Sequence, residues 1–579
     1  MLFPERMFYR RNKIHIKTAR ASMLVFLFLV LVGADQSWGE IIPGDRRINW
    51  KPGIPGGIPS RTAICANVKD APYKAEGDGV TDDTAAIQRA INDCPEGQGV
   101  YLPTGTYKLT YPLSIYKGIV LRGDGPDKTK ILGNSSSART IINIGGWVEK
   151  NATHVVSGYT KGSKSIIVSD ASDFKSGDYI IIDQLNDRSF VDKKDCTWYN
   201  RENNNRALGQ ILQVISVETA TKKITFDPEL YYTFSSTYSP QVFKVAEKVV
   251  KYAGIEDLYV ERVNAYPGQG FNIRVQSAAY SWVKNVESNK VSGRHIQFSR
   301  CFRCELRDSF IHHAHNYGAG GNAYGISLTE MSSDTLVENN IAYYLNTGIE
   351  LEGAGPGNVI AYNYTDVMWN YDYPDTTWLM ADIGSHCAHP YMALFEGNIS
   401  SHFSPDYQHG SASHYTLFRN YIDRQHFAKH PAFPNDYDGN TRRHRIPIDI
   451  WYFNRYMNIV GNVLGQPGDT GSYEIEDRDC ASDEIAVYKL GYNSDGDCSG
   501  AGNDPQVKAT LLRHGNYDYM HNATRWDSNI PERTLPPSLY LRSKPAFFGN
   551  LRWPAIGPDL DPMAGTLPAK QRFETMAPR

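Results

Sequence analysis

The sequence predicts an all-β protein folded as a single-stranded parallel β-helix, a solenoid in which each coil adds one short strand to each of its sheets. The first observation is a residue that recurs at one place of a degenerate hydrophobic pattern through the middle of the chain. The recurring positions are Asn285, Ser309, Asn340, Asn363, Asn398, Asn420 and Asn462. Three of the intervals are 22 to 24 residues long, and the others fit the same unit with insertions. Such a period is typical of stacked repeats.

The second observation is the make-up of the repeating unit. It has no helical stretch and consists of short β-rich runs, such as 325–328, 335–337 and 348–351, separated by Gly, Asn and Ser. Three strands and three turns complete one coil, and coils stack at the strand spacing of about 4.8 Å. An inward polar residue at one corner needs partners, which a ladder of Asn amides supplies. Asn also marks turns, but apolar neighbours at fixed offsets favour the ladder.

Length and composition limit the class of protein. The chain has 579 residues, 21% of them charged, with a net charge of -3 and 12% aromatic residues. These values exclude a nucleic-acid-binding protein that works through bulk positive charge, and they exclude a disordered chain. The 37 Tyr and 10 Trp suit a β-protein with an aromatic-lined surface on which sugars can stack.

The N-terminus has the features of an export signal. Basic residues precede the apolar run 23–32, and small residues near 37–39 offer a cleavage site. We therefore expect residues 1–39 to be a signal peptide and the mature protein to be secreted or periplasmic, with an uncleaved anchor as the alternative. Eight cysteines fit that compartment. Proximity in sequence suggests two disulfides, Cys65–Cys94 and Cys480–Cys498, while Cys301 and Cys304 lack the further ligands of a zinc site.

The pattern divides the chain into four parts after the signal. Residues 40–149 are expected to form an N-terminal cap and the first coils, with a helix over 85–91 that closes the open end of the solenoid. Residues 150–245 alternate like a small antiparallel barrel and are expected to be an inserted β-module that flanks the cleft. Residues 246–465 supply the central coils with long loops, and 466–579 the last coils and a loop-rich cover.

Three motifs of the cap resemble a known family. The runs 77–84 (GDGVTDDT), 99–107 (GVYLPTGTY) and 119–125 (IVLRGDG) resemble the N-terminus of the pectate-lyase and polygalacturonase-like superfamily of right-handed parallel β-helix proteins. The resemblance covers about residues 60–125. It implies a right-handed coil and an extracellular protein that acts on polysaccharide as a lyase, hydrolase or epimerase. The chain lacks the paired-Asp signature of the polygalacturonases, so the resemblance does not fix the chemistry.

Titratable residues gather on one face of the predicted coils. Counting back about 13 residues from each ladder position places Arg274, Gln297, Ser327 and Thr329 on the outward side of one strand in successive coils, followed by an acidic, His-rich stripe. Our catalytic candidates in that stripe are Glu350, Glu352, Asp382, Asp406 and His409. Carboxylates in neighbouring coils lie about 5 Å apart and those two coils apart about 10 Å at the backbone. These spacings suit paired carboxylates for glycoside hydrolysis.

Substrate-binding candidates come from the long loops and their aromatic neighbours. The loop 419–445 carries a surplus of positive charge that would attract an anionic sugar. The candidates are His386, His414, Arg419, Arg424, Arg443, Trp369 and Trp378. The same acidic stripe could instead bind Ca2+, which a lyase uses to neutralise a uronate carboxylate.

These observations predict a secreted enzyme that degrades a polysaccharide, with an acidic, uronate-containing substrate favoured. Between mechanisms, β-elimination by a polysaccharide lyase is favoured, because the family resemblance and the basic loop both suggest uronates. A glycoside hydrolase with paired carboxylates is the first alternative, and a non-catalytic sugar-binding solenoid or adhesin is the second. No nucleic-acid partner and no stable membrane insertion after signal cleavage are expected. The sequence leaves the sugar, the linkage and the oligomeric state open.

Overall fold

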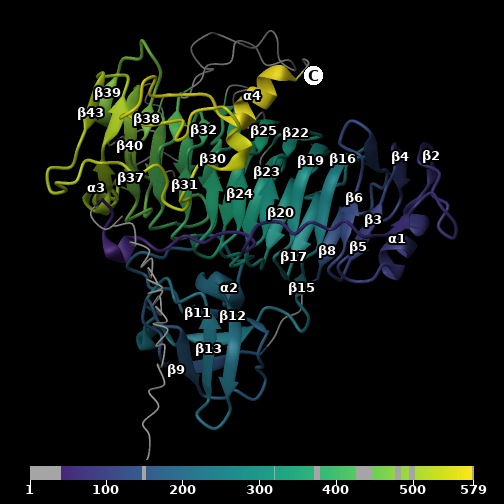
Figure 1. Ribbon diagram of the computed structural model, residues 1–579. Helices are drawn as coiled ribbons and strands as arrows, with labels where there is room; N and C mark the ends of the chain where they lie inside the picture. Colours follow the sequence, from purple (N-terminus) through teal and green to yellow (C-terminus); the bar gives the residue numbers. More distant parts are fainter. Residues whose placement is uncertain are drawn as a thin grey trace, which may run out of the picture. The chain divides into compact units, whose positions relative to one another are not determined.

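The chain folds as a right-handed parallel β-helix whose coils stack along one axis (Figure 1). The computed structural model describes residues 41–146, 151–318, 320–370, 378–424, 446–475, 484–493 and 502–576, with only the backbone at 378 and 379. The predicted signal peptide and the predicted Cys480–Cys498 pair lie outside these residues. Within them, the predicted fold class is confirmed: parallel sheets run along the solenoid and enclose one apolar interior of Ile, Leu, Val and Phe side chains.

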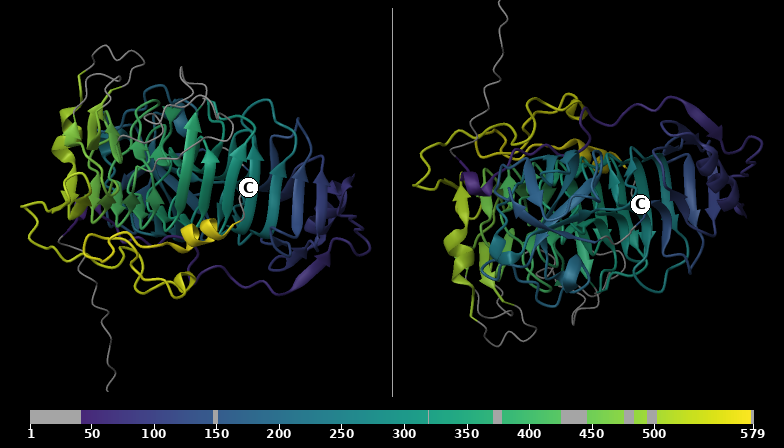
Figure 2. Two further views of the ribbon diagram at one scale, coloured as in Figure 1. Left: turned by 90° about the horizontal axis from the view of Figure 1, so that it is seen from above. Right: turned by 90° about the horizontal axis from the view of Figure 1, so that it is seen from below.

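Each coil contributes strands to three rows (Figure 2). The first row, which we call the front sheet, contains β5 (Leu113–Ile115), β8 (Thr140–Gly145), β17 (Phe271–Gln276), β20 (Arg294–Ser299), β23 (Tyr324–Thr329), β26 (Thr347–Glu352), β30 (Ile383–Ser385), β33 (Phe403–Pro405), β36 (Ile448–Trp451), β40 (Ala486–Tyr492) and β39 (Ser472–Ile475). The second row contains β1 (Ile64–Asn67), β3 (Gly99–Tyr101), β6 (Val120–Arg122), β21 (Glu305–Arg307), β24 (Leu336–Glu338), β27 (Val359–Ala361), β31 (Leu394–Glu396), β34 (Thr416–Phe418), β37 (Asn458–Val460) and β41 (Leu512–His514). The third row contains β2 (Asp78–Asp82), β4 (Gly105–Leu109), β7 (Thr129–Gly133), β22 (Phe310–Ala314), β25 (Ile341–Leu345), β28 (Tyr364–Asn370), β32 (Ile399–Ser400), β35 (Tyr421–Ile422), β38 (Val463–Leu464) and β42 (Asn516–Asp518). The long strands β16 (Gly254–Arg262) and β19 (Trp282–Val291) belong to both the second and third rows.

Short strands complete the sheets at their margins. They are β15 (Val250–Lys251), which pairs with β18 (Ala278–Ala279), β29 (Trp378–Leu379), which pairs with β28, and β43 (Ala523–Arg525), which pairs with β42.

The predicted asparagine ladder runs along the corner between the second and third rows. The Oδ1 atom of Asn363 accepts hydrogen bonds from the backbone N (2.9 Å) and the Nδ2 (3.1 Å) of Asn340 in the preceding coil. The same pair of bonds repeats from Asn363 to Asn398, from Asn398 to Asn420 and from Asn420 to Asn462. Each amide therefore satisfies a buried backbone N–H of its neighbour, which is the physical reason for an inward polar residue at this corner.

The ladder differs from the prediction at both ends. Asn285 is not part of it, because the true repeat there is 23 residues and aligns Val286, not Asn285, with Ser309. The hydroxyl of Ser309 accepts from the backbone N of Val286 (3.1 Å), while Asn285 turns outward and donates to Asp257 (2.7 Å). At the other end the ladder continues one coil further, to Asn516.

The open N-terminal end of the solenoid is covered by helix α1 (Thr84–Asp93), which includes the predicted helix 85–91. Ile87, Ala90 and Ile91 lie on its buried face, at helical spacing, and join the interior of the first coils. A disulfide between Cys65 in β1 and Cys94 at the end of α1 fixes the cap to the first strand, and this pairing was predicted correctly.

A closed antiparallel barrel interrupts the solenoid within residues 150–245. Its strands are β9 (Thr153–Ser157), β10 (Ser165–Val168), β11 (Tyr179–Gln184), β12 (Leu208–Glu218), β13 (Lys223–Asp227) and β14 (Gln241–Lys244), with the short helix α2 (Arg201–Asn204) and the 3-10 turn η3 (Ser236–Tyr238) in its connections. Tyr179 and Ile211 of the barrel pack on Tyr280, Phe302 and Met331, in the turns that follow strands of the front sheet. The barrel therefore stands beside the C-terminal ends of the front-sheet strands.

The two terminal segments lie along the solenoid. Residues 41–61, which include the 3-10 turn η2 (Gly44–Arg46), are bonded to coils far apart in sequence, since Gly53 N donates to Asp334 O and Ile54 N to Glu305. After helix α3 (Pro505–Thr510), residues 526–576 pass outside the ladder corner through the 3-10 turn η4 (Ala546–Phe548) to α4 (Pro568–Thr575). Phe573 of α4 packs on Tyr343 of β25. Among the described residues no helix has the length and apolar character needed to span a bilayer.

Candidate functional site

The strand register of the front sheet aligns polar side chains in rows. Arg274, Gln297, Ser327 and Glu350 are directly paired across β17, β20, β23 and β26, as predicted, while Ile326 and Leu328 of the same sheet point into the core. Thr329 and Glu352 form a parallel row two residues further along. Because Leu351 pairs with Ser385 and Ser385 with Pro405, His386 and Asp406 continue the row of Glu352 into the next two coils.

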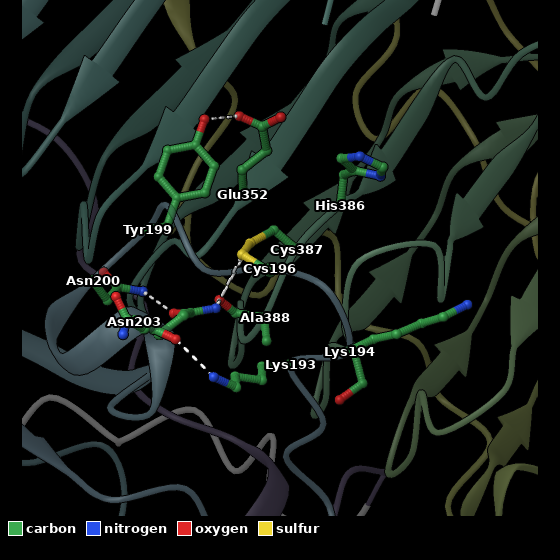
Figure 3. The surroundings of a disulfide bond; sticks show 12 residues. Lys193, Lys194, Cys196, Tyr199, Asn200, Asn203, Glu352, His386, Cys387 and Ala388 are labelled. Atoms are coloured by element: carbon green, nitrogen blue, oxygen red, sulfur yellow. Dashed lines mark hydrogen bonds between the residues drawn. A yellow bond between two sulfur atoms is a disulfide. The ribbon is translucent and has the colours of Figure 1, made fainter. Parts of the chain in front are cut away.

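Glu352 is buried at the end of β26 and is bound by two residues from elsewhere in the chain. Both of its carboxylate oxygens accept from the guanidinium of Arg294 at 2.8 Å. Its Oε2 also accepts from the hydroxyl of Tyr199 at 2.7 Å (Figure 3). Burial acts to lower the pKa of Arg294, but the charge of Glu352 outweighs it and raises that pKa above its usual range. These donors occupy both oxygens of Glu352 and hold its carboxyl group in one position.

Glu350, two residues before Glu352, differs from it in the surroundings of its carboxyl group. Its side chain is 5% exposed, and in the part of the chain that the structure describes no hydrogen-bond or ion-pair partner lies on its carboxyl group. Burial raises its pKa well above the usual range, the neighbouring His386 opposes that shift, and the charges of Glu352 and Asp406 reinforce it. Glu350 is therefore protonated where ordinary carboxylic acids are ionised, which is the state needed by a general acid.

His386 and Asp406 form an ion pair beside Glu350. The Nδ1–H of His386 donates to Oδ2 of Asp406 at 2.7 Å, and the other oxygen of Asp406 accepts from the backbone N of Gln408 at 3.0 Å. Burial alone would lower the pKa of His386, but Asp406 and the two glutamates raise it to about 9. The side chain of Asp406 stays 25% exposed, so this carboxylate can reach solvent water.

His409 lines the same site in a different protonation state. Its ring meets that of His386 edge-on at 4.6 Å, and it lies 5.1 Å from the indole of Trp198, which is 52% exposed. Burial and the charge of His386 lower the pKa of His409, so its imidazole is neutral at neutral pH. Trp198 supplies an exposed aromatic face of the kind on which sugar rings stack.

The residues Trp198 and Tyr199 come from the barrel, and a disulfide holds them at the site. Cys196, three residues before Tyr199, is bonded to Cys387, the residue after His386 (Figure 3). The Nδ2 of Asn204 donates to the Sγ of Cys196 and to the carbonyl of Ala388, both at 3.1 Å. Gly353, directly after Glu352, has a φ of 61°, and a Cβ there would lie 3.3 Å from the Cβ of Tyr199. The loop and the solenoid thus approach too closely for a larger residue.

Several predicted site residues lie elsewhere in the fold. Asp382 turns to the corner beside β28, where its carboxylate accepts from Thr365 and from the backbone N of Ser401, and burial raises its pKa to about 8. His414 is buried, stacks on Tyr456, and has its pKa lowered to about 3 by burial. Trp369 is fully buried and offers no ring face to a sugar.

The arginines of the predicted basic loop are structural where the structure describes them. Arg419 is buried and binds Asp559 and the carbonyls of Leu535 and Ile556, so it fixes the C-terminal cover to the ladder corner. Arg424 is buried in an ion pair with Asp469 at 3.0 Å. These contacts correct the prediction that the two residues face the substrate. Arg443 lies outside the described residues, as does the side chain of Trp378.

Three site residues have no direct signal in the sequence. Arg294, Tyr199 and Trp198 were missed because their role depends on the pairing of distant strands and on how the barrel docks. The front-sheet register pairs Arg294 with Tyr324, whose ring centroid lies 5.1 Å from the guanidinium carbon. That row lies five residues before the row of Glu352, so register alone does not indicate the ion pair. No pattern in the sequence predicts Cys196 as the partner of Cys387.

The arrangement does not fit a calcium site. Ca2+ takes six to eight oxygen ligands, mainly from carboxylates and carbonyls. Here Arg294 and Tyr199 occupy Glu352, His386 occupies Asp406, and burial raises the pKa of Glu350, which disfavours the anionic form that a cation would need. Within the described ranges no group of three His, Cys, Asp or Glu side chains is placed to hold a metal ion.

Comparison with known proteins supports the predicted fold and the resemblance to pectate-lyase-like proteins. Residues 65–301 match the family described as rhamnogalacturonase A/epimerase, pectate lyase-like, which confirms the resemblance found in the cap motifs. The chain is 38% identical over 95 residues to a glucan 1,3-beta-glucosidase of Cochliobolus carbonum, and 32% identical over 108 residues to an exo-poly-alpha-D-galacturonosidase of Dickeya chrysanthemi. These alignments cover 14% and 16% of this chain, and only 12% and 17% of the two relatives.

A solved structure extends the similarity over most of the chain. The tailspike gp61 of Pseudomonas phage phi297 superimposes with a TM-score of 0.50 and 15% identity, covering 79% of this chain and 76% of the tailspike. At that identity the comparison shows a shared fold only.

Proposed function

We propose that this protein is an exported glycoside hydrolase that cleaves an acidic polysaccharide across its front sheet. The observation that carries the proposal is a pair of carboxyl groups in contrasting surroundings: Glu350 is buried, which raises its pKa, whereas Asp406 is bound to His386 and partly exposed to solvent. A hydrolase of this kind needs one carboxylic acid to protonate the leaving oxygen and one carboxylate to activate water. The family match and the two hydrolase relatives support a polysaccharide substrate.

We assign a role to each group from its surroundings. Glu350 donates its proton to the glycosidic oxygen, and Asp406 takes a proton from the water that attacks the anomeric carbon. His386 holds the Asp406 carboxylate in place through the 2.7 Å bond and supplies positive charge beside it. Glu352, bound to Arg294, keeps an anion next to Glu350 and so helps Glu350 retain its proton.

The spacing of the two groups favours inversion of the anomeric configuration. Glu350 is in register with Gly384 and Ser404, and Asp406 lies two residues past Ser404, so the two backbones are about 10 Å apart across the sheet and about 7 Å apart along it. Carboxyl separations of about 6.5–9.5 Å leave room for a water molecule and are typical of inverting enzymes, whereas about 5–5.5 Å is typical of retaining ones.

Elimination by a lyase is the second candidate, and His409 is the observation that favours it. A neutral, half-buried imidazole beside an exposed indole can accept the C5 proton of a uronate. Such a lyase would have to neutralise the uronate without help from the carboxylates of this site, or recruit Ca2+ by displacing their present partners.

One pair of assays distinguishes the candidates. The mature protein is incubated with a panel of acidic and neutral polysaccharides while reducing ends and absorbance near 235 nm, the band of an unsaturated uronate, are followed, with Ca2+ and with a chelator. Hydrolysis predicts new reducing ends without absorbance, lost in Glu350→Gln and Asp406→Asn but kept in the surface control Arg89→Gln. Absorbance that is lost in His409→Gln establishes elimination, and loss on chelation adds Ca2+. Silence in both assays, with glycan binding retained, supports the adhesin alternative.

Export is tested separately. N-terminal sequencing of the protein recovered from the medium or periplasm is expected to begin after residue 39. Recovery of the intact N-terminus in the membrane fraction would instead support the uncleaved anchor.

A further inference from the structure

Two arginines flank one phenylalanine on the front sheet, toward the N-terminal coils from Glu350. The guanidinium carbon of Arg139 lies 5.1 Å from the ring centroid of Phe271, and that of Arg274 lies 5.0 Å from it. Phe271 and Thr140 are paired in the sheet, so Arg139, the residue before β8, and Arg274, in β17, come from adjacent coils. Because both contact the same ring, the two guanidinium carbons lie within about 10 Å of each other.

Among the described residues, neither arginine has an acidic partner. Arg274 donates from Nε to the Oε1 of Gln297 at 2.9 Å, and Arg139 donates from Nε to the carbonyl of Gln269 at 3.1 Å. Within the described part of the chain, no carboxylate lies within 4.0 Å of either guanidinium. Their remaining N–H groups are left to water or to a ligand.

Other arginines of this region behave differently. Arg294 is paired with Glu352, Arg300 with Glu330 at 3.1 Å, and Arg303 with Asp227 at 2.8 Å. Burial lowers the pKa of Arg274, and Glu330, the strongest opposing acid, does not reverse the shift. A cation that is largely buried, close to a second cation and unpaired is costly unless a negative ligand shares the site.

The position relates this pair to the proposed cleavage site. Arg274, Gln297, Ser327 and Glu350 are successive members of one row, so Arg274 lies three strand spacings, about 14 Å, from Glu350. An oligosaccharide of a few units laid across the strands spans that distance, and a single sugar does not. The two guanidinium groups offer planar donor pairs that match a carboxylate.

We propose that Arg139 and Arg274 form a distal subsite that binds the carboxylate of a uronate in the polysaccharide chain, a few sugar units from the bond that is cleaved. The subsite rests on the proposed function, which sets the direction in which the substrate lies. Arg139 and Arg274 take the place of the loop residues Arg419 and Arg424 as the source of selectivity for acidic substrates. Phe271 and Gln297 hold the two guanidinium groups in position.

The test measures binding rather than turnover. The mature chain carrying Glu350→Gln, which prevents cleavage under the proposed mechanism, is titrated by calorimetry with oligogalacturonides, with neutral cello-oligosaccharides of equal length, and with dextran sulfate as a charge control. Added to this background, Arg274→Gln and Arg139→Gln are each expected to weaken binding of the uronate oligomer about tenfold, from the loss of charge-assisted hydrogen bonds. Arg274→Lys is expected to recover part of the affinity, and neutral probes are not expected to respond.

Controls separate the subsite from folding and from net charge. Arg89→Gln removes one positive charge from the surface of α1, where Arg89 is 59% exposed, and should leave binding unchanged. Arg139 is exposed, so Arg139→Gln remains a fair test even if Arg274→Gln fails to fold. Uronate affinity that both substitutions leave intact, no binding of any probe, or an equal preference for dextran sulfate would overturn the proposal.

The outcomes also separate this proposal from the hydrolase proposal. Loss of uronate binding in the arginine variants, with a wild-type protein that cleaves nothing, supports the subsite and refutes the hydrolase. Cleavage of polysaccharide by the wild type with arginine variants that bind as before supports the hydrolase and refutes the subsite.

Discussion

The asparagine ladder makes a specific prediction about stability, which Asn398 tests best because it has ladder partners on both sides. Its Oδ1 accepts from the backbone N and the Nδ2 of Asn363, both at 3.0 Å. Its Nδ2 donates to the carbonyl of Ile360 at 2.8 Å and to the Oδ1 of Asn420 at 3.0 Å. Replacement by alanine removes all four bonds from a fully buried site.

The magnitude follows from what each partner retains. The Nδ2 of Asn363 keeps its bond to Val337, and the Oδ1 of Asn420 keeps the backbone N of residue 398. The backbone N–H of Asn363 keeps no ladder acceptor, and a buried unsatisfied group costs about 1–3 kcal/mol. With the other lost bonds at about 1 kcal/mol each or less, Asn398→Ala should lower the free energy of unfolding by roughly 4 kcal/mol.

The assay is equilibrium urea unfolding of the mature protein followed by far-UV circular dichroism. Asn529→Ala, at an exposed position, serves as the matched control and should change stability by less than about 0.5 kcal/mol. Asn398→Asp keeps the shape but replaces the donor with an oxygen. Because a buried carboxyl has a raised pKa when folded, its destabilisation should be smallest at low pH and grow as the pH rises above about 4. An Asn398→Ala protein as stable as the control would refute the ladder as a source of stability.

Three further predictions concern the site. Folding raises the pKa of His386 from 6.5 to about 9, so the stability contributed by its protonated form is complete below pH 6.5 and is lost as the pH rises through 9. Urea unfolding at pH 6 and at pH 9.5 should show this loss of stability. Asp406→Asn should largely remove the difference between the two pH values. Replacing Cys196 and Cys387 together by serine should lower kcat/KM on polysaccharide about tenfold or more and leave the far-UV spectrum unchanged. The reason is that the disulfide fixes Tyr199 and Trp198 at the site. An unchanged kcat/KM would contradict this reasoning. Tyr199→Phe removes one donor from the buried Glu352 and should destabilise the fold by about 1–3 kcal/mol, whereas Tyr111→Phe at the surface should not.

The sequence could predict whatever repeats or is local. A coil places one residue type at one corner, so the ladder from Ser309 to Asn462 appeared as a period, and only a one-residue change in repeat length displaced Asn285 from it. Alternation along a strand has a period of two, so Glu350 and Glu352 could be placed outward next to the buried Leu351. Cys65 and Cys94 pair because a short helix returns the chain to the first strand.

Where loops intervene, the strand phase was lost, and this left open whether Asp382, predicted as catalytic, or His386, predicted to bind substrate, continues the row of Glu352. The structure resolves it through hydrogen bonds. Thr365 and Ser401 hold Asp382 in the corner, and Asp406 holds His386 on the front sheet. The prediction that Arg419 and Arg424 face the substrate was wrong for a related reason. A sequence shows that a residue is charged, but it does not show whether an acidic partner such as Asp559 or Asp469 will bind that residue in the fold.

The sequence by itself therefore determined the solenoid, the ladder from Ser309 to Asn462 and the sheet face that carries Glu350 and Glu352, because these depend on short-range periodicity. Only the tertiary structure decided which of those residues meet and what protonation state each adopts. Tyr199 reaches Glu352 across 153 residues of sequence because the barrel docks beside the end of β26. Burial and neighbouring charge, which no periodicity encodes, then make Glu350 an acid and His386 a cation.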